Sequence, residues 1–237
     1  MIPLKDDLPS RSAPVMTVSI ITLNVLVFLY YISLQLGISL EVDNPPQAAE
    51  TAQQFVLEFG LVPCRLMGLC RFPEDQPAPL FTVFSSMFLH GSFFHVGGNM
   101  LYLWIFGNNI EDTLGHARFT LFYLLSGIAA AATQVLVAPG SEVPMIGASG
   151  AVSGVLGAYL LLFPQSSVLT LVIFGFFWRL LRIPAVLVLG FWIVVQILNG
   201  LGAFGAAGGV AWFAHIGGFF AGMLLLIILR PRAVARW

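Results

Sequence analysis

The stretch "MIGASGAVSGVLGAYLLLF", residues 145–163, contains no Asp, Glu, Lys or Arg and is rich in glycine and alanine. The whole chain has the same character: 58% of its 237 residues are hydrophobic, 9% are charged, and its mean hydropathy is +0.92. Soluble domains carry about 25% charged residues. The composition therefore indicates a multi-pass integral membrane protein in a lipid bilayer. A net charge of −1 without a Lys/Arg cluster gives no indication of nucleic-acid binding.

Continuous rather than alternating apolar runs predict membrane helices, because only helices and closed barrels satisfy backbone groups in lipid. A helix needs about 20 residues to cross the hydrocarbon core. The longest charge-free run, 183–229, exceeds one helix, and its glycine-rich part "NGLGAFGAAGG" (199–209) predicts a break. We predict an all-α bundle of six transmembrane helices, at about 15–36, 91–110, 117–138, 149–163, 184–198 and 210–229. Segment 165–178 is short and precedes Arg179 and Arg182, so it is interpreted as interfacial or re-entrant rather than a seventh span.

Basic residues predict the orientation, because loops rich in Lys and Arg stay in the cytoplasm. With both termini inside, eight of the ten basic residues are cytoplasmic, and only Arg65 and Arg71 lie outside. This favours an N-in, C-in topology. The predicted organisation is a short cytoplasmic segment (1–14), a membrane domain (15–229) with a long, irregular outside loop (37–90), and a short cytoplasmic tail (230–237).

The two cysteines, Cys64 and Cys70, both fall in the predicted outside loop. In an oxidising compartment they are able to form a disulfide, and two free thiols are the alternative. Two cysteines without paired histidines beside them do not predict a zinc site. The sequence predicts no metal and no cofactor.

A few polar side chains interrupt the predicted spans, where such residues are costly and mark candidate functional sites. Ser149 lies 15 residues before Pro164, His215 lies 15 before Arg230, and His95 lies 16 before Glu111. At about 1.5 Å per residue, all three lie roughly 22–24 Å above the inner boundary. Asn99 lies one helical turn below His95. The agreement in depth predicts one site.

Small residues explain how the helices carrying this site approach each other. On the fourth predicted helix Gly150, Gly154 and Gly157 share one face, and on the sixth Gly218 and Gly222 follow His215 in the same way. Such faces allow membrane helices to pack closely. Docking the two faces is expected to bring the hydroxyl of Ser149 near the imidazole of His215.

A serine hydroxyl near a histidine favours nucleophilic catalysis, because the imidazole takes the hydroxyl proton. No Asp or Glu is predicted at this depth, so the expected arrangement is a Ser149–His215 dyad. Acyl transfer also needs donors for an oxyanion. The candidates are His95, Asn99 and the backbone N–H of Ser149 at a helix N-terminus.

These residues resemble the rhomboid family of intramembrane serine proteases. "GASG" (147–150) is similar to the family's GxSG motif, "HGSFFHVGGN" (90–99) to HxxxxHxxxN, and "AHIGGFFAG" (214–222) to AHxxGxxxG. The resemblance implies a six-helix bundle with a water-filled cavity that opens outward and cleaves transmembrane substrates near their outer ends. It implies Ser149 as nucleophile, His215 as general base, and His95 and Asn99 in the oxyanion hole. The supporting residues are His90, expected to bond the first outside loop, and Gly147, Gly150, Gly218 and Gly222.

The chain departs from the family's pattern at two places. Phe81 and Thr82 stand where many members have Trp-Arg, and Ser153 stands where some have a tyrosine that stacks on the histidine. His215 is therefore expected to be oriented by Ser153 or by packing.

The sequence leaves three functions to compare. The first is an intramembrane serine endopeptidase acting through an acyl-enzyme on transmembrane-protein substrates. The second is a catalytically inactive rhomboid-like protein that binds or escorts membrane helices. The third, a transporter or channel, is disfavoured because the spans lack carboxylates and the chain lacks an evident internal repeat. The compact chain suggests a bacterial cell membrane.

Overall fold

The structure is a computed structural model that describes residues 1–38, 45–73, 76–202 and 210–231. Part of the predicted break (203–209) and most of the predicted tail (232–237) lie outside the described residues.

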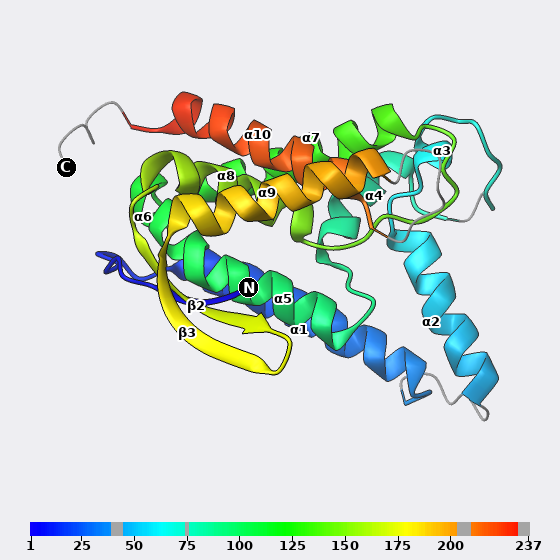
Figure 1. Cartoon of the computed structure of the whole chain (residues 1–237). Helices are drawn as coiled ribbons and strands as arrows, with labels where there is room; N and C mark the ends of the chain where they lie inside the picture. The colour runs from blue at the N-terminus through cyan, green and yellow to red at the C-terminus, as the bar shows by residue number, and fades with distance from the viewer. Residues whose placement is uncertain (39–44, 74–75, 203–209, 232–237) are drawn as a thin grey trace.

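The described chain is mostly helical, and each predicted span overlaps a helical segment (Figure 1). The segments are α1 (Val15–Gln35), α5 (Phe93–Tyr102) continuing through the π-helical turn η2 (Leu103–Gly107) into α6 (Asn108–Leu114), α7 (His116–Val137), α8 (Ser149–Leu162), α9 (Ala185–Gly202) and α10 (Trp212–Leu229). Four of them, α1, α7, α9 and α10, are long and apolar enough to cross a membrane. A fifth span results if 79–88 and 93–114, bent by 81°, are counted together. Six crossings and the N-in, C-in topology stay predictions.

Helix α8 has 14 residues and lies at the centre of the bundle, where every residue from Gly150 to Tyr159 is buried. Its glycines contact α10 directly. A Cβ added to Gly218 would lie 2.1 Å from the carbonyl oxygen of Gly150, and one added to Gly222 would lie 2.1 Å from that of Gly154. The two predicted small-residue faces therefore meet backbone to backbone, at a spacing that only glycine allows.

The all-α prediction is wrong, because the structure contains a three-stranded antiparallel sheet in the order β1-β2-β3. Its strands are β1 (Ile2–Asp6), β2 (Ser167–Phe174) and β3 (Phe177–Pro184). Segment 165–178 is thus mainly the first strand and the turn of a hairpin, with Gly175 in the turn at φ +56°. Val, Ile, Thr and aromatic residues favour strands, and a two-residue turn favours positive φ. The partner strand β1 lies about 160 residues earlier, so no local pattern identified it.

The predicted outside loop is largely helical rather than irregular. It contains α2 (Pro45–Phe59), α3 (Pro63–Leu66), α4 (Pro79–Ser85) and the 3₁₀ turn η1 (Ser86–Phe88). A disulfide joins Cys64 to Cys70. The buried guanidinium of Arg65 donates to the carbonyl oxygens of Glu58 and Pro77. These bonds join residues that lie 7 and 12 positions apart in the loop.

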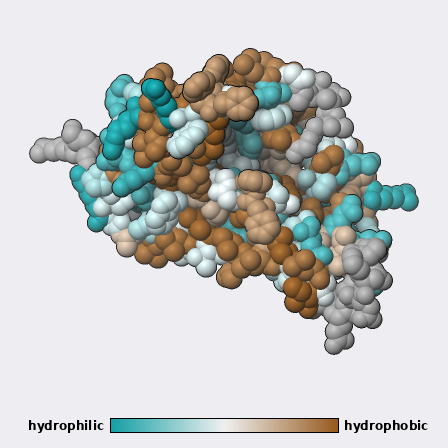
Figure 2. Space-filling view, turned by 60° about the horizontal axis from the view of Figure 1, so that its bottom comes forward, coloured by the Kyte–Doolittle hydropathy of each residue, from teal (hydrophilic) through white to brown (hydrophobic). Residues whose placement is uncertain are grey.

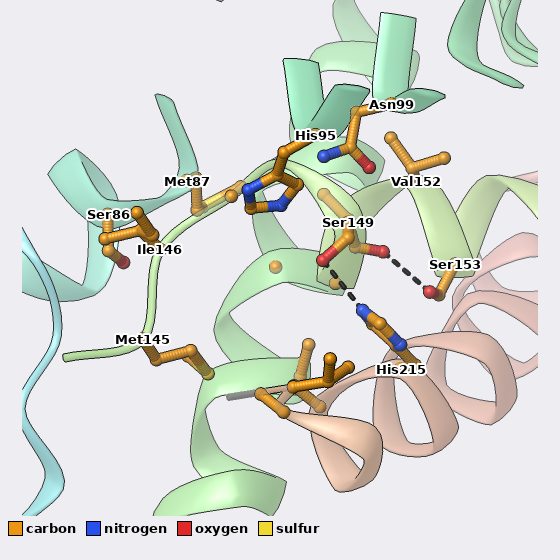
Figure 3. A pocket seen from close by; sticks show the side chains of 18 of the residues that line it. Ser86, Met87, His95, Asn99, Met145, Ile146, Ser149, Val152, Ser153 and His215 are labelled. Carbon is orange, nitrogen blue, oxygen red and sulfur yellow. Dashed lines mark hydrogen bonds between the residues drawn. The ribbon is translucent and has the colours of Figure 1, made fainter. Parts of the chain in front are cut away.

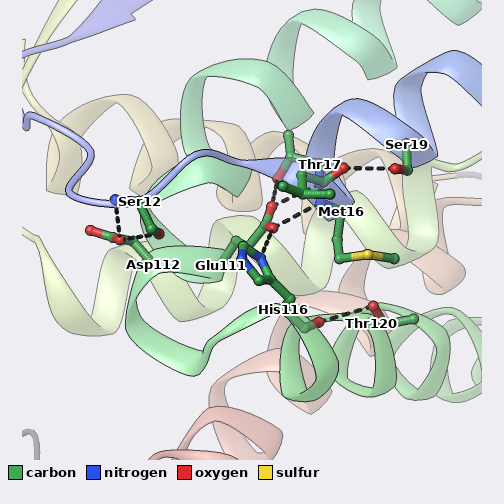
Figure 4. Close-up of polar contacts among 9 residues, drawn as sticks. Ser12, Met16, Thr17, Ser19, Glu111, Asp112, His116 and Thr120 are labelled. Atoms are coloured by element: carbon green, nitrogen blue, oxygen red, sulfur yellow. Dashed lines mark hydrogen bonds and ion pairs between the residues drawn. The ribbon is translucent and has the colours of Figure 1, made fainter.

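The N-terminal turn of α1 is capped from another helix rather than by its own sequence (Figure 4). The carboxylate of Glu111, in α6, accepts hydrogen bonds from the backbone N–H groups of Met16 and Thr17, both at 2.8 Å. The neighbouring carboxylate of Asp112 accepts from the backbone N–H of Ser12 at 2.9 Å. A negative charge at a helix N-terminus satisfies orphan N–H groups and opposes the helix dipole. Glu111 therefore connects α1 to α6.

Asp6 attaches the sheet to the helices. Its Oδ2 accepts from Asn109 Nδ2 at 2.6 Å and from the Tyr159 hydroxyl at 2.7 Å. Burial raises the pKa of the Asp6 carboxyl above its ordinary value of 3.8, because the charged form loses its hydration.

Candidate active site

A cavity of about 600 Å³ lies among the helices and is lined by the side chains that the sequence analysis singled out (Figure 3). Ser149, His215, His95 and Asn99 all face it, from α8, α10 and α5. The cavity is also lined by Gln196 of α9. Five polar side chains thus gather at one place in an apolar bundle.

The hydroxyl oxygen of Ser149 lies 2.8 Å from Nε2 of His215, although 66 residues separate them. Ser149 is the first residue of α8, and His215 lies in the first turn of α10. The glycine contacts between these helices hold the two side chains at hydrogen-bond distance. The contact of Nδ1, the other ring nitrogen of His215, determines which of the two groups is the donor in this bond.

Nδ1 of His215 lies 2.8 Å from Oε1 of Gln196, whose side chain is 6% exposed. The amide nitrogen of Gln196 donates to the carbonyl oxygen of Trp192, one turn earlier, at 3.3 Å. This second bond is consistent with the amide oxygen facing the imidazole. An amide oxygen only accepts, so Nδ1 of His215 carries the proton. Nε2 is then an acceptor for the hydroxyl of Ser149.

Gln196 was missed by the sequence analysis, which expected Ser153 or packing to orient His215. The hydroxyl of Ser153 donates instead to the carbonyl oxygen of Ser149, at 2.6 Å, as helical serines do toward the preceding turn. Packing contributes through Trp192, whose ring centroid lies 5.9 Å from that of His215. The signal for Gln196 was present, because a polar residue inside an apolar span marks a candidate site.

His95 and Asn99 lie on the side of Ser149 opposite His215 (Figure 3). A Cβ added to Gly147 would lie 2.6 Å from Nε2 of His95, and Gly147 has φ +121°. A side chain there would therefore collide with the imidazole and strain the backbone. Asn99, on α5 like His95, is 8% exposed.

His90 holds Asn99 in place. Its Nε2 accepts from Nδ2 of Asn99 at 3.0 Å and from the backbone N–H of Ala148 at 3.4 Å. These bonds join α5 to the turn before Ser149, and the expected bond from His90 to the first outside loop stays a prediction. An amide nitrogen carries two hydrogens, so the Asn99 amide keeps one for another acceptor.

The backbone adds further donors beside Ser149. The first N–H groups of a helix have no carbonyl partner within it, and α8 begins at Ser149. The site therefore combines a hydroxyl bonded to a neutral imidazole with amide, imidazole and backbone N–H groups nearby. That is the set of groups that acyl transfer requires.

Comparison with known proteins points to one family. A family model described as Rhomboid domain matches residues 77–232. Rhomboid protein 1, mitochondrial, of Saccharomyces cerevisiae is 31% identical over 158 residues, which are 64% of this chain and 42% of that protein. RHOMBOID-like protein 1 of Arabidopsis thaliana is 29% identical over 215 residues, 83% of this chain and 51% of that protein. Presenilin-associated rhomboid-like protein, mitochondrial, of Bos taurus is 33% identical over 119 residues, 48% of this chain and 32% of that protein.

The chain spans about half the length of these curated relatives or less. Two of the three carry mitochondrial names, which disfavours the bacterial cell membrane expected from the compact chain. The apolar helices identify an integral membrane protein.

Proposed function

Because the chain belongs to the rhomboid family, we propose that it is an intramembrane serine endopeptidase that hydrolyses peptide bonds in or near transmembrane segments of membrane proteins. The observation that carries the proposal is the line of hydrogen bonds from Ser149 through His215 to Gln196. It gives the serine a base in the correct tautomer, which a packing serine does not need.

In the proposed reaction the hydroxyl oxygen of Ser149 attacks the scissile carbonyl while its proton passes to Nε2 of His215. The tetrahedral intermediate collapses, and His215 returns the proton to the departing amine. An ester between Ser149 and the substrate's acyl part remains. Water then hydrolyses this ester with His215 as base again. Throughout, Gln196 accepts from Nδ1–H and is a positioning residue.

The oxyanion is proposed to bind at His95, Asn99 and the backbone N–H of Ser149. The support is their place around Ser149 and the hydrogen bond that Asn99 donates to His90, which leaves the second N–H of the Asn99 amide available. Donors fixed before the reaction stabilise the charge that develops in the transition state.

The substrate class follows from the surroundings of the cavity. It lies among apolar helices, two of which, α9 and α10, are long enough to cross a membrane. A substrate segment reaching Ser149 is therefore proposed to come from a membrane-embedded protein. The disulfide between Cys64 and Cys70 supports placing residues 37–90 in an oxidising compartment.

The second candidate is a catalytically inactive rhomboid-like protein that binds or escorts membrane helices. It is favoured by the departure at Ser153, which contacts the carbonyl of Ser149 rather than the imidazole of His215. In this case Ser149 and His215 would be structural polar contacts between α8 and α10.

The test is covalent labelling of the purified full chain with a fluorophosphonate probe, beside Ser149→Ala and His215→Ala. The matched control is Ser126→Ala, which removes a buried hydroxyl from α7 instead. The endopeptidase proposal expects labelling of wild type and the control, and none of the two site variants. Cleavage of a single-span reporter is expected to follow the same order. If folded wild type neither labels nor cleaves but binds the reporter as Ser149→Ala does, the second candidate replaces the first.

A further inference from the structure

The β2–β3 hairpin connects α8 to α9 (Figure 1). The side chains at its tip are aromatic, and the described residues leave them exposed. The exposed fractions are 84% for Phe174, 101% for Phe176, 81% for Phe177 and 71% for Trp178. Contiguous exposed apolar surface of this kind marks a contact with a membrane or a partner.

The position of the hairpin favours the membrane. Strand β3 ends at Pro184 and α9, a candidate span, begins at the next residue. The outward side chains at the start of α9 are apolar too, with Leu187 60% and Phe191 55% exposed. Figure 2 shows hydrophobic residues across the middle of one face of the molecule, with hydrophilic residues gathered toward both ends. The base of the hairpin is thus continuous with a helix whose exposed side chains suit lipid, and the apolar tip lies at the other end of the same two strands.

The backbone of the hairpin limits how deep the tip lies. Strand β3 is at the edge of the sheet, so half of its N–H and C=O groups have no strand partner. The hydrocarbon core offers such groups no hydrogen bond, whereas the headgroup region does. The tip therefore fits the boundary between headgroups and acyl chains, where Trp and other aromatic residues gather.

Two arginines beside the tip fit the same boundary. Arg179 and Arg182 are exposed on β3, and the described residues give neither guanidinium an ion pair. They lie on opposite faces of the strand, because they are three residues apart in a regularly paired segment and successive side chains of a strand alternate between its faces. Guanidinium groups bind phosphate oxygens through paired N–H donors. Both faces of the hairpin thus carry a cation within a few residues of the aromatic tip.

We propose that the β2–β3 hairpin is a membrane-interface anchor: Phe174, Phe176, Phe177 and Trp178 insert into the leaflet at the α8–α9 connection, and Arg179 and Arg182 bind anionic phospholipid headgroups. In the N-in topology this is the cytoplasmic leaflet. The anchor attaches the inner ends of α8 and α9 to the bilayer surface. These are the helices that carry Ser149 and Gln196.

The test places an environment-sensitive fluorophore at single engineered cysteines of the full chain in lipid nanodiscs. The native cysteines are joined in a disulfide and do not react. Phe176→Cys reports the tip, Leu187→Cys on α9 is the lipid control, and Gln53→Cys, exposed on α2, is the water control. Discs contain phosphatidylcholine, with or without phosphatidylglycerol, and a lipid carrying a doxyl quencher.

The anchor predicts that quenching at Phe176→Cys approaches that at Leu187→Cys and exceeds that at Gln53→Cys several-fold. Phosphatidylglycerol is expected to increase it further. Arg179→Gln combined with Arg182→Gln abolishes this increase, whereas Arg118→Gln, exposed at the start of α7, preserves it.

Two results overturn the insertion of the tip. In one, the Phe176→Cys probe matches the water control; in the other, both doxyl lipid and aqueous iodide fail to reach it, so that a protein covers the tip. An unchanged response to phosphatidylglycerol in the double arginine variant overturns the headgroup contact. All readouts are independent of peptide hydrolysis.

Discussion

Replacing Gln196 by leucine tests whether the imidazole of His215 needs its acceptor. Leucine keeps most of the side-chain volume but leaves the buried Nδ1–H of His215 without a partner at 2.8 Å. Such a loss costs about 1–3 kcal/mol, and more in the transition state, where the imidazolium makes a charge-assisted bond. A loss of about 2 kcal/mol corresponds to roughly a 30-fold fall in kcat. KM is expected to change little, because the bond strengthens mainly as the charge develops.

The assay is steady-state cleavage of a single-span reporter, with fluorophosphonate labelling as a second readout. Asn199→Leu is the matched control, since this amide on the same helix bonds, among the described residues, only to the carbonyl oxygen of Val195. Gln196→Glu keeps an oxygen acceptor facing His215 and is expected to recover activity. A folded Gln196→Leu protein with wild-type kcat, or an equal loss in the control, refutes the positioning role.

Three further changes probe the site and the fold. Gly218→Ala forces α10 away from the Gly150 carbonyl and is expected to abolish cleavage and to lower the free energy of unfolding by about 1–3 kcal/mol. Gly190→Ala in α9, with open space around its Cβ, is expected to keep both cleavage and stability, and unfolding and cleavage assays compare the two variants. Asn99→Ala should lower kcat by about 10²–10³ if its amide binds the oxyanion, and an unchanged kcat removes it from that role. Because the folded-state pKa of Asp6 is raised, the folded state binds the proton more tightly, and this residue's contribution to stability falls as pH rises from 3.8 through the raised pKa. Asp6→Asn keeps an oxygen acceptor but does not titrate, so the variant should lose this part of the pH dependence of the thermal unfolding temperature above pH 3.8. A variant whose unfolding temperature depends on pH as that of wild type does contradicts the raised pKa of Asp6.

The helices and the candidate site were largely predictable because their signals are local. Charge-free apolar runs indicate helices wherever lipid is the solvent, and each predicted range overlaps a helix. The glycine faces around Gly150 and Gly218 repeat at helical spacing, so their meeting followed from the same periodicity. Equal distances from the predicted inner ends of the spans, at Pro164 and Arg230, then placed Ser149 and His215 at one level.

The errors arose where the partner of a segment is distant in the chain. Strand β2, in segment 165–178, pairs with the neighbouring β3 and also with the distant residues 2–6, which no local pattern connects to it. The α1 N-terminus carries no capping side chain of its own, and Glu111, 94 residues after Thr17, supplies the carboxylate. In the sequence Gln196 is a polar residue on an apolar helix with no indicated partner. In the structure the packing of α9 against α10 places it beside His215.

The sequence by itself determined the membrane class, the helical segments, the close-packing faces and the chemical identity of Ser149, His215, His95 and Asn99. All of these depend on residue type and on a spacing of a few residues, which any helix converts into a face or a depth. The tertiary structure alone decided which acceptor holds the imidazole, which strand pairs with the hairpin, and which carboxylate caps α1. Hydrogen bonds and strand pairs require two groups within about 3 Å, and only the folded chain brings residues 19, 94 or 160 positions apart to that distance.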